Sequence, residues 1–138
     1  TGPWTVDGLD LSAEMLREAR VKVAGEGDLV YRHLHEGDLT ATLDIPSGAY
    51  GAVVSCGTFT HGHVGPTAFD ELYRITRPGG LFAIGINPDH FTNLGFADRF
   101  VDDVAAGRIT EPVIRRVNTY EAGDHAGRLS SVAVFRTL

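Results

Sequence analysis

Two spacings of apolar residues alternate along this chain. Short runs rich in apolar and β-branched residues predict strands, and apolar residues three and four positions apart predict amphipathic helices. The predicted strands are residues 6–9, 30–35, 52–56, 81–86, 113–120 and 129–137. The predicted helices are residues 12–24, 66–75 and 93–106. This alternation predicts an α/β fold with a mostly parallel sheet, and the last two strands predict an antiparallel hairpin at its edge.

Turn and capping residues stand where the spacing changes. Ser12 can cap the first helix. Gly79 follows Pro78 and supplies the positive φ that the second central position of a type II turn requires. Residues 57–65, after the strand 52–56, are rich in glycine and histidine and predict a loop.

Length, charge and cysteine content limit the number of domains, the kinds of partner and the cellular compartment that we expect for this protein. With 138 residues, of which 43% are hydrophobic, residues 1–138 are expected to form a single domain with one core. The net charge is −6 and the basic residues form no cluster beyond Arg115 and Arg116, so we expect no nucleic-acid partner. One cysteine and the lack of a signal pattern predict a cytoplasmic protein. The longest apolar stretch, residues 81–86, is too short to cross a membrane.

An acid, Asp10, stands between the first predicted strand and its helix. In nucleotide-binding α/β folds such an acid grips the ribose, about 20 residues after a glycine-rich loop on the preceding strand. That strand and loop are absent from the residues given. Leu11 and Met15 would form an apolar wall for an adenine face. The alternatives are a helix-capping or solvated Asp10 and two ordinary core residues.

A second acid, Asp38, follows the strand 30–35. Its carboxylate could accept a hydrogen bond from an adenine amino group, while the amide of Leu39 donates to a ring nitrogen. The alternative is a loop aspartate that caps the next segment. Carboxylates at the ends of two successive strands are a stronger signal than either alone.

Four segments, in this order, resemble the class I S-adenosylmethionine-dependent methyltransferases. They are Val6-Asp7-Gly8-Leu9-Asp10-Leu11-Ser12, Glu36-Gly37-Asp38-Leu39, Tyr50-Gly51-Ala52-Val53-Val54-Ser55 and Leu72-Tyr73-Arg74-Ile75-Thr76-Arg77-Pro78-Gly79-Gly80-Leu81. Within this family, residues 55–64 are most similar to the small-molecule type related to the Williams-Beuren-region methyltransferase-like proteins.

The resemblance implies a Rossmann-like sheet whose first, central strand is absent from the given residues, and S-adenosylmethionine as the cofactor. By analogy Asp10 binds the ribose, and Leu11 and Met15 contact the adenine face. The remaining implied contacts are Asp38 with Leu39 at the adenine edge, and Ser55 with Cys56 near the methyl donor. The sequence departs from the family in having Gly51 where an acid usually stands, and in lacking the Gly-x-Gly loop.

The loop after the strand 52–56 is where the family often places a histidine near the methyl acceptor. His61 is therefore the candidate base, and the alternative is a loop histidine bonded to backbone. His61 and His63 have no third ligand at a recognised spacing, so no metal site is expected. His90 and Phe91, with Phe96 and Phe100, could roof an acceptor pocket, and the alternative for Phe96 and Phe100 is a helix face packed on the sheet. His90 has no partner pattern, and an exposed or structural role is its alternative.

The leading function is methyl transfer to a small molecule, conditional on the missing first segment. One rival is a non-catalytic remnant or assembly domain that keeps only the fold. The other is a nicotinamide-dependent dehydrogenase, because Asp10 would suit a ribose there too. The turn at residues 77–80 and the terminal hairpin speak against the dehydrogenase.

Loss of the central strand would leave the strands 6–9 and 52–56 with unpaired edges. Three outcomes are open. The chain could be longer, another chain or a second copy could supply the strand, or the two strands could pair directly.

Overall fold

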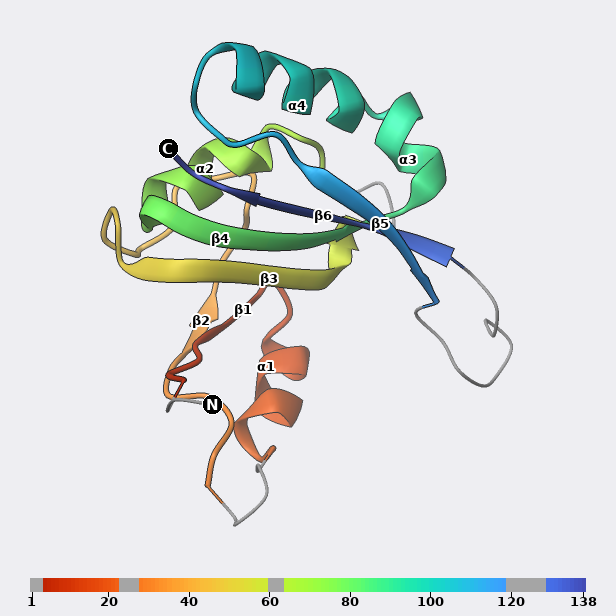
Figure 1. The fold of residues 1–138 in the computed structure, drawn as a ribbon. Coiled ribbons are helices and arrows are strands. Elements are labelled where there is room, and N and C mark those ends of the chain that lie inside the picture. Colours follow the sequence, from red (N-terminus) through yellow and green to blue (C-terminus); the bar gives the residue numbers. More distant parts are fainter. Residues whose placement is uncertain (1–3, 23–27, 60–63, 119–128) are drawn as a thin grey trace. The chain divides into compact units, whose positions relative to one another are not determined.

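The computed structural model describes residues 4–22, 28–59, 64–118 and 129–138, which divide into two units (Figure 1). The first unit is Thr1–Asp44 and the second is Ile45–Leu138. The single domain predicted from the chain length stays a prediction.

The first unit is built on a short parallel strand pair. Strand β1 (Gly8–Asp10) pairs with β2 (Leu34–Glu36), and helix α1 (Ala13–Arg20) lies between them in sequence. The hydroxyl of Ser12 accepts a hydrogen bond from the amide of Met15 at 3.3 Å, which confirms Ser12 as the cap of α1.

Strand β2 is shorter than the predicted residues 30–35. The backbone N–H of His33 donates to the side chain of Asp7 at 3.2 Å rather than to a strand carbonyl. The guanidinium of Arg32 donates to both carboxylate oxygens of Asp7, at 3.0 and 2.6 Å. The regular ladder therefore begins only at Leu34.

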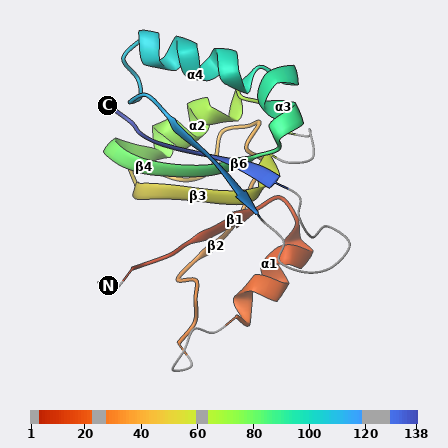
Figure 2. The same ribbon diagram turned by 45° about the vertical axis from the view of Figure 1, so that its right-hand side comes forward.

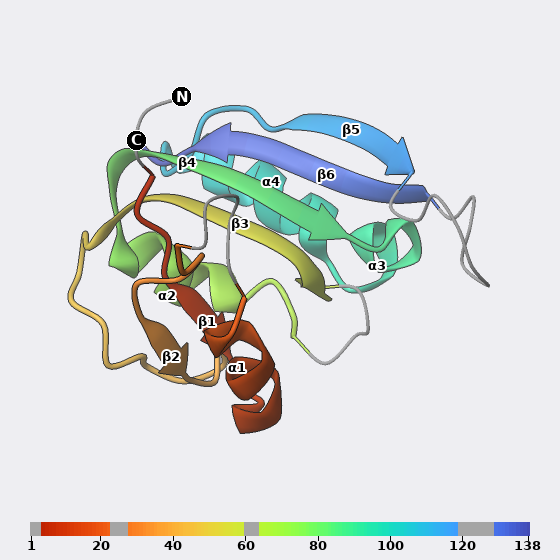
Figure 3. The same cartoon turned by 90° about the horizontal axis from the view of Figure 1, so that it is seen from below.

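The second unit contains a four-stranded mixed sheet in the order β3-β4-β6-β5 (Figure 3). The four strands are β3 (Tyr50–Phe59), β4 (Thr76–Ile86), β5 (Val113–Asn118) and β6 (Leu129–Arg136). Strands β3 and β4 are parallel, while β6 is antiparallel to both β4 and β5. The predicted α/β fold with a parallel region and a terminal antiparallel pair is confirmed. Residues 119–128, between the two strands of the predicted hairpin, lie outside the described residues.

Strands β1 and β3 belong to different sheets among the described residues. Strand β1 pairs with β2, and β3 pairs with β4. The three outcomes left open by the sequence for these two strands stay predictions.

Strands β3 and β4 are both longer than predicted. Phe59, assigned to a loop from the sequence, is 1% exposed and lies opposite Ile86 after a register shift that follows Ser55. Because this ring is buried in the core, the strand pairing resumes at Phe59 and β3 extends beyond its predicted end. Strand β4 begins at Thr76, and the expected turn interrupts it, with Gly79 at φ 76° as predicted.

Three helices lie on one face of the four-stranded sheet (Figures 1 and 2). They are α2 (Ala68–Ile75), α3 (Pro88–Asn93) and α4 (Phe96–Ala105). The helix predicted over residues 93–106 is confirmed as α4, and the short helix α3 before it was not predicted. Asn87 caps α3 by accepting from the amide of Asp89 at 2.9 Å, and Gly95, at φ 79°, separates α3 from α4.

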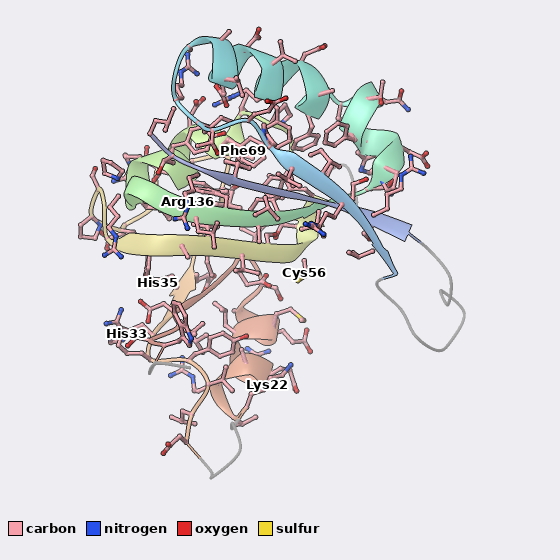
Figure 4. All side chains as sticks on the ribbon, viewed as in Figure 1. Lys22, His33, His35, Cys56, Phe69 and Arg136 are labelled. Atoms are coloured by element: carbon pink, nitrogen blue, oxygen red, sulfur yellow. The ribbon has the colours of Figure 1, made fainter. Side chains whose placement is uncertain are left out.

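An aromatic cluster fills the space between these helices and the sheet. Phe69 of α2 is fully buried, and its ring lies 5.4 Å from that of Phe100 on α4 (Figure 4). Phe82 and Phe135, paired across β4 and β6, stack with their ring centroids 4.9 Å apart. Offset aromatic contacts of this kind stabilise a core beyond the area that they bury.

A buried carboxylate joins the helices. Asp103 on α4 is 0% exposed and accepts hydrogen bonds from Tyr73 Oη at 2.9 Å, Arg99 Nε at 2.6 Å and Arg108 Nη1 at 2.8 Å. Arg99 also donates to Asp70 at 2.7 Å. Because each Asp103 oxygen is paired with a guanidinium, the charge can stay buried. No helix of the described residues is long and apolar enough to span a bilayer.

Replacing Asp103 by alanine should lower the free energy of unfolding by about 3 kcal/mol, because Arg99 and Tyr73 lose their shared acceptor. Urea titration followed by circular dichroism measures this. The matched control is Asp102→Ala, an exposed position on the same helix, with an expected change within about 0.5 kcal/mol. Equal effects of the two substitutions would refute a stabilising role for the buried network.

The hydroxyl of Tyr73 should make stability fall at alkaline pH. Burial and the hydrogen bond to Asp103 raise its pKa above the ordinary value. A raised pKa means that only the unfolded chain ionises above about pH 10, so stability is complete below that pH and is lost as the pH rises. The expected slope is at most about 1.4 kcal/mol per pH unit. Urea titrations from about pH 9 to about pH 11 should show a smaller slope for Tyr73→Phe.

Candidate functional site

Asp10 ends strand β1 and shapes the turn into α1. Its Oδ1 accepts from the amide of Ser12 at 2.8 Å. Ser12, not Asp10, caps the helix, so the capping alternative does not account for this carboxylate. Its Oδ2 accepts no hydrogen bond from the residues that the structure describes in this unit, which leaves one oxygen for a donor from outside.

Two large apolar side chains next to Asp10 are exposed. Leu11 is 68% exposed and Met15 is 56% exposed, whereas Leu16, on the other side of α1, is 8% exposed. The core alternative for Leu11 and Met15 is therefore wrong. Two exposed apolar side chains flanking a carboxylate are suited to the flat face of a ring.

Asp38 and Leu39 follow β2, as predicted. The Oδ1 of Asp38 accepts from the backbone N–H of Thr40 at 2.8 Å and from its hydroxyl at 2.7 Å. These two bonds lower the pKa of Asp38, the hydroxyl more than the amide. This oxygen has the local turn role that was the alternative, while Oδ2 and the amide of Leu39 have no hydrogen-bond partner among the described residues.

A backbone bond joins the ends of the two strands that carry these acids. The amide of Gly37 donates to the carbonyl of Asp10 at 3.1 Å. Parallel pairing of β1 with β2 places both carboxyl ends at the same edge of this small sheet. The first unit therefore brings together Asp10, Leu11 and Met15 with the segment that holds Asp38 and Leu39.

Ser55 and Cys56 lie in the second unit, in the middle of β3, and point to opposite faces of the sheet. Ser55 is paired with Ile84, whose side chain is fully buried, and its Oγ is buried without a hydrogen bond. Cys56 is exposed and points away from the helices (Figure 4). The two residues predicted near the methyl donor thus have different surroundings.

A glycine allows β3 and β4 to approach closely at this point. A Cβ on Gly85 would lie 3.2 Å from the carbonyl oxygen of Ser55 and 3.3 Å from that of Cys56. Any larger side chain would push the strands apart beside Ser55.

Gly51, where the family usually has an acid, lies against a guanidinium. A Cβ at this position would be 2.5 Å from Nη2 of Arg77. The side chain of Arg77 thus fills the space that a larger residue would need, which explains this departure from the pattern.

His90, on α3, has a feature that the sequence pattern did not predict. Its Nδ1 is buried and has no hydrogen-bond partner. The signal that could have placed it is Asn87 followed by Pro88, a cap and first helical residue directly after the strand. His61, the predicted base, and His63 lie outside the described residues. The residues that are described contain no group of three side chains able to hold a metal ion.

Known proteins match both the sequence and the fold. The sequence profile of a methyltransferase domain matches residues 1–84, more than half of the chain. The PH0226 protein of Pyrococcus horikoshii is 17% identical with a TM-score of 0.65, over 98% of this chain and 72% of that protein. An S-adenosylmethionine-dependent methyltransferase of Methanosarcina mazei is 12% identical with a TM-score of 0.59, over 97% of this chain and 82% of that one.

A third similar structure carries a different activity. The cyclase SpnF is 12% identical with a TM-score of 0.65, over 96% of this chain and 66% of its own. Identities this low establish the fold alone, so the family rests on the profile match. On that match, the chain belongs to the class I S-adenosylmethionine-dependent methyltransferases, and S-adenosylmethionine is its cofactor.

Proposed function

We propose that this chain transfers a methyl group from S-adenosylmethionine to a small molecule, with Asp10 holding the ribose of the cofactor. The observation that carries the proposal is the unpartnered Oδ2 of Asp10 beside exposed Leu11 and Met15. A carboxylate is a strong acceptor for ribose hydroxyls, and the bond from Ser12 orients it. The adenine face then covers the exposed parts of Leu11 and Met15.

Asp38 and Leu39 are suited to the adenine edge. With Oδ1 of Asp38 held by Thr40, its Oδ2 can accept from the exocyclic amino group. The amide of Leu39 can donate to a ring nitrogen. This donor and acceptor pattern would distinguish adenine from the other bases.

The residues nearest the chemistry belong to the second unit. The cofactor supplies an electrophilic methyl group bound to a positively charged sulfur. Ser55 and Cys56 are the residues that we propose for the methyl-donor side. His61, in the loop after β3, is the base that the family resemblance implies, and it lies outside the described residues. Methyl transfer requires the acceptor to be held about 3 Å from the methyl carbon with water excluded, so positioning is the main task of these residues.

We further propose that full activity requires a glycine-rich loop in addition to these residues. In this family such a loop holds the carboxylate end of the cofactor, and none of the site residues identified here supplies that contact. The proposed residues of the first unit, Asp10, Leu11, Met15, Asp38 and Leu39, contact only the ribose and the adenine.

An assembly role is the second candidate function. Among the described residues, β1 and β3 each pair along one edge only. An open edge can accept a strand from a second copy or another chain. A similar methyltransferase of Haloferax volcanii has been solved in complex with the activator Trm112, which supports association with a protein partner.

Substitution of Asp10 should weaken binding of S-adenosylhomocysteine. Asp10→Asn keeps an acceptor for the amide of Ser12 but removes the charge, and a hydrogen bond to a charged group contributes about 1.5–3 kcal/mol. We expect a loss of affinity of at least about tenfold in isothermal titration calorimetry. Asp28→Ala, at an exposed position, is the control and should leave the affinity unchanged.

The same titration separates the candidate functions. Binding that is equal for Asp10→Asn and the unchanged chain would contradict the ribose role of Asp10. No binding by the unchanged chain would favour the non-catalytic assembly role. A larger thermal shift with NAD than with S-adenosylhomocysteine would favour a dehydrogenase.

A further inference from the structure

Among the described residues of the second unit, two buried side-chain atoms lack hydrogen bonds. They are Oγ of Ser55 and Nδ1 of His90. The large majority of buried side-chain polar atoms in native proteins are paired, and leaving one unpaired costs about 1–3 kcal/mol. Two such atoms in one unit indicate positions kept for the polar groups of a ligand.

Ser55 faces the side of the sheet that the helices cover. It pairs in register with Ile84, and its neighbour Val53 pairs with Phe82. Partners in a parallel pair share a face, and Phe82 lies against Tyr73 of α2 at a ring distance of 5.5 Å. The hydroxyl of Ser55 therefore lies on the helix-covered side, opposite Ile84 and two residues before the carboxyl end of β4.

His90 lies at the same end and on the same side. Helix α3 follows β4 directly, and the amide of Asn87 donates to the carbonyl of Phe59 at 3.4 Å, which joins the ends of the two strands. Phe91 of α3 contacts Phe100 of α4, with ring centroids 6.0 Å apart, so α3 packs with the other helices. In open α/β sheets, ligands bind at this carboxyl edge.

The chemistry of the two atoms selects the ligand. Neutral imidazole with its proton on Nε2 leaves Nδ1 as an acceptor, and the serine hydroxyl can donate. A ligand hydroxyl satisfies both atoms, because it donates its proton to Nδ1 and accepts from Ser55 with one lone pair. Its second lone pair remains for attack. A neutral amine has a single lone pair and cannot both accept from Ser55 and attack.

We infer that His90 is the general base and Ser55 the orienting donor for a small-molecule acceptor that is methylated on a hydroxyl oxygen. This rests on the proposed function and names the acceptor class for the same site. The hydroxyl oxygen forms the new bond to the methyl carbon, and the carbon–sulfur bond breaks with its electron pair remaining on sulfur. The hydroxyl proton passes to Nδ1 of His90 and then to water.

Phenol and anisole test this assignment, because they have similar shapes and differ in the hydroxyl proton. Phenol should bind the full chain about tenfold more tightly than anisole, because anisole cannot donate to Nδ1 of His90 and leaves this buried atom unpaired. In nitrogen-15 NMR spectra of the imidazoles, phenol should shift Nδ1 of His90 and anisole should not. Ser55→Ala should weaken the binding of both compounds, because the oxygen of each can accept from Ser55, and His90→Phe should abolish the preference for phenol.

The controls distinguish loss of the acceptor site from unfolding of a variant and from failure of the proposed methyl transfer. His33→Phe, at an exposed position of the first unit, should leave the preference for phenol intact, and circular dichroism checks that each variant folds. Equal binding of phenol and anisole, no binding of either, or a proton on Nδ1 would overturn the inference. If that result came with tight binding of S-adenosylhomocysteine, only the acceptor assignment would fail. A preference for phenol over anisole that depends on His90, without binding of S-adenosylhomocysteine, would instead support the acceptor site and contradict methyl transfer.

Discussion

The parallel pairing of β3 with β4 is the constraint on which the second unit depends. Two parallel neighbours need a crossover connection, and α2 provides it on one face of the sheet. The pairing also places both carboxyl ends at one edge, where the bond from Asn87 to Phe59 joins them. Residues distant in sequence, Ser55 and His90, are brought to that edge for this reason alone.

The helices on this face are held by two different kinds of interaction. The aromatic cluster around Phe69 supplies non-directional burial, which tolerates small shifts of a helix. The bonds of Asp103 to Tyr73, Arg99 and Arg108 are directional and specify how α4 lies against α2. Arg99 also donates to the carbonyl of Pro66 at 3.2 Å, so the same network fixes the segment that enters α2.

The sequence was sufficient to predict a structural feature where one residue type has a single local consequence. Ser12 caps α1, and Gly79 has the positive φ that its turn needs. It was insufficient where distant groups decide. The ring of Phe59 extends β3 because of the core that it enters, and Asp7 shortens β2 by taking the amide of His33. For the site, the sequence indicated the acids at strand ends and named His90 as a candidate roof of an acceptor pocket. It did not indicate the buried Nδ1 of His90, since burial of one nitrogen depends on packing.

Asp103 and His90 show how burial distinguishes structural from functional polar groups in the same unit. Both belong to the helical layer, and each has buried polar atoms. Both carboxylate oxygens of Asp103 accept hydrogen bonds from neighbouring side chains, so replacing Asp103 can only destabilise the fold. Nδ1 of His90 and Oγ of Ser55 have no hydrogen-bond partner among the described residues, so the fold would be more stable with apolar atoms in their place. Retaining such atoms makes sense when a bound molecule completes their hydrogen bonds.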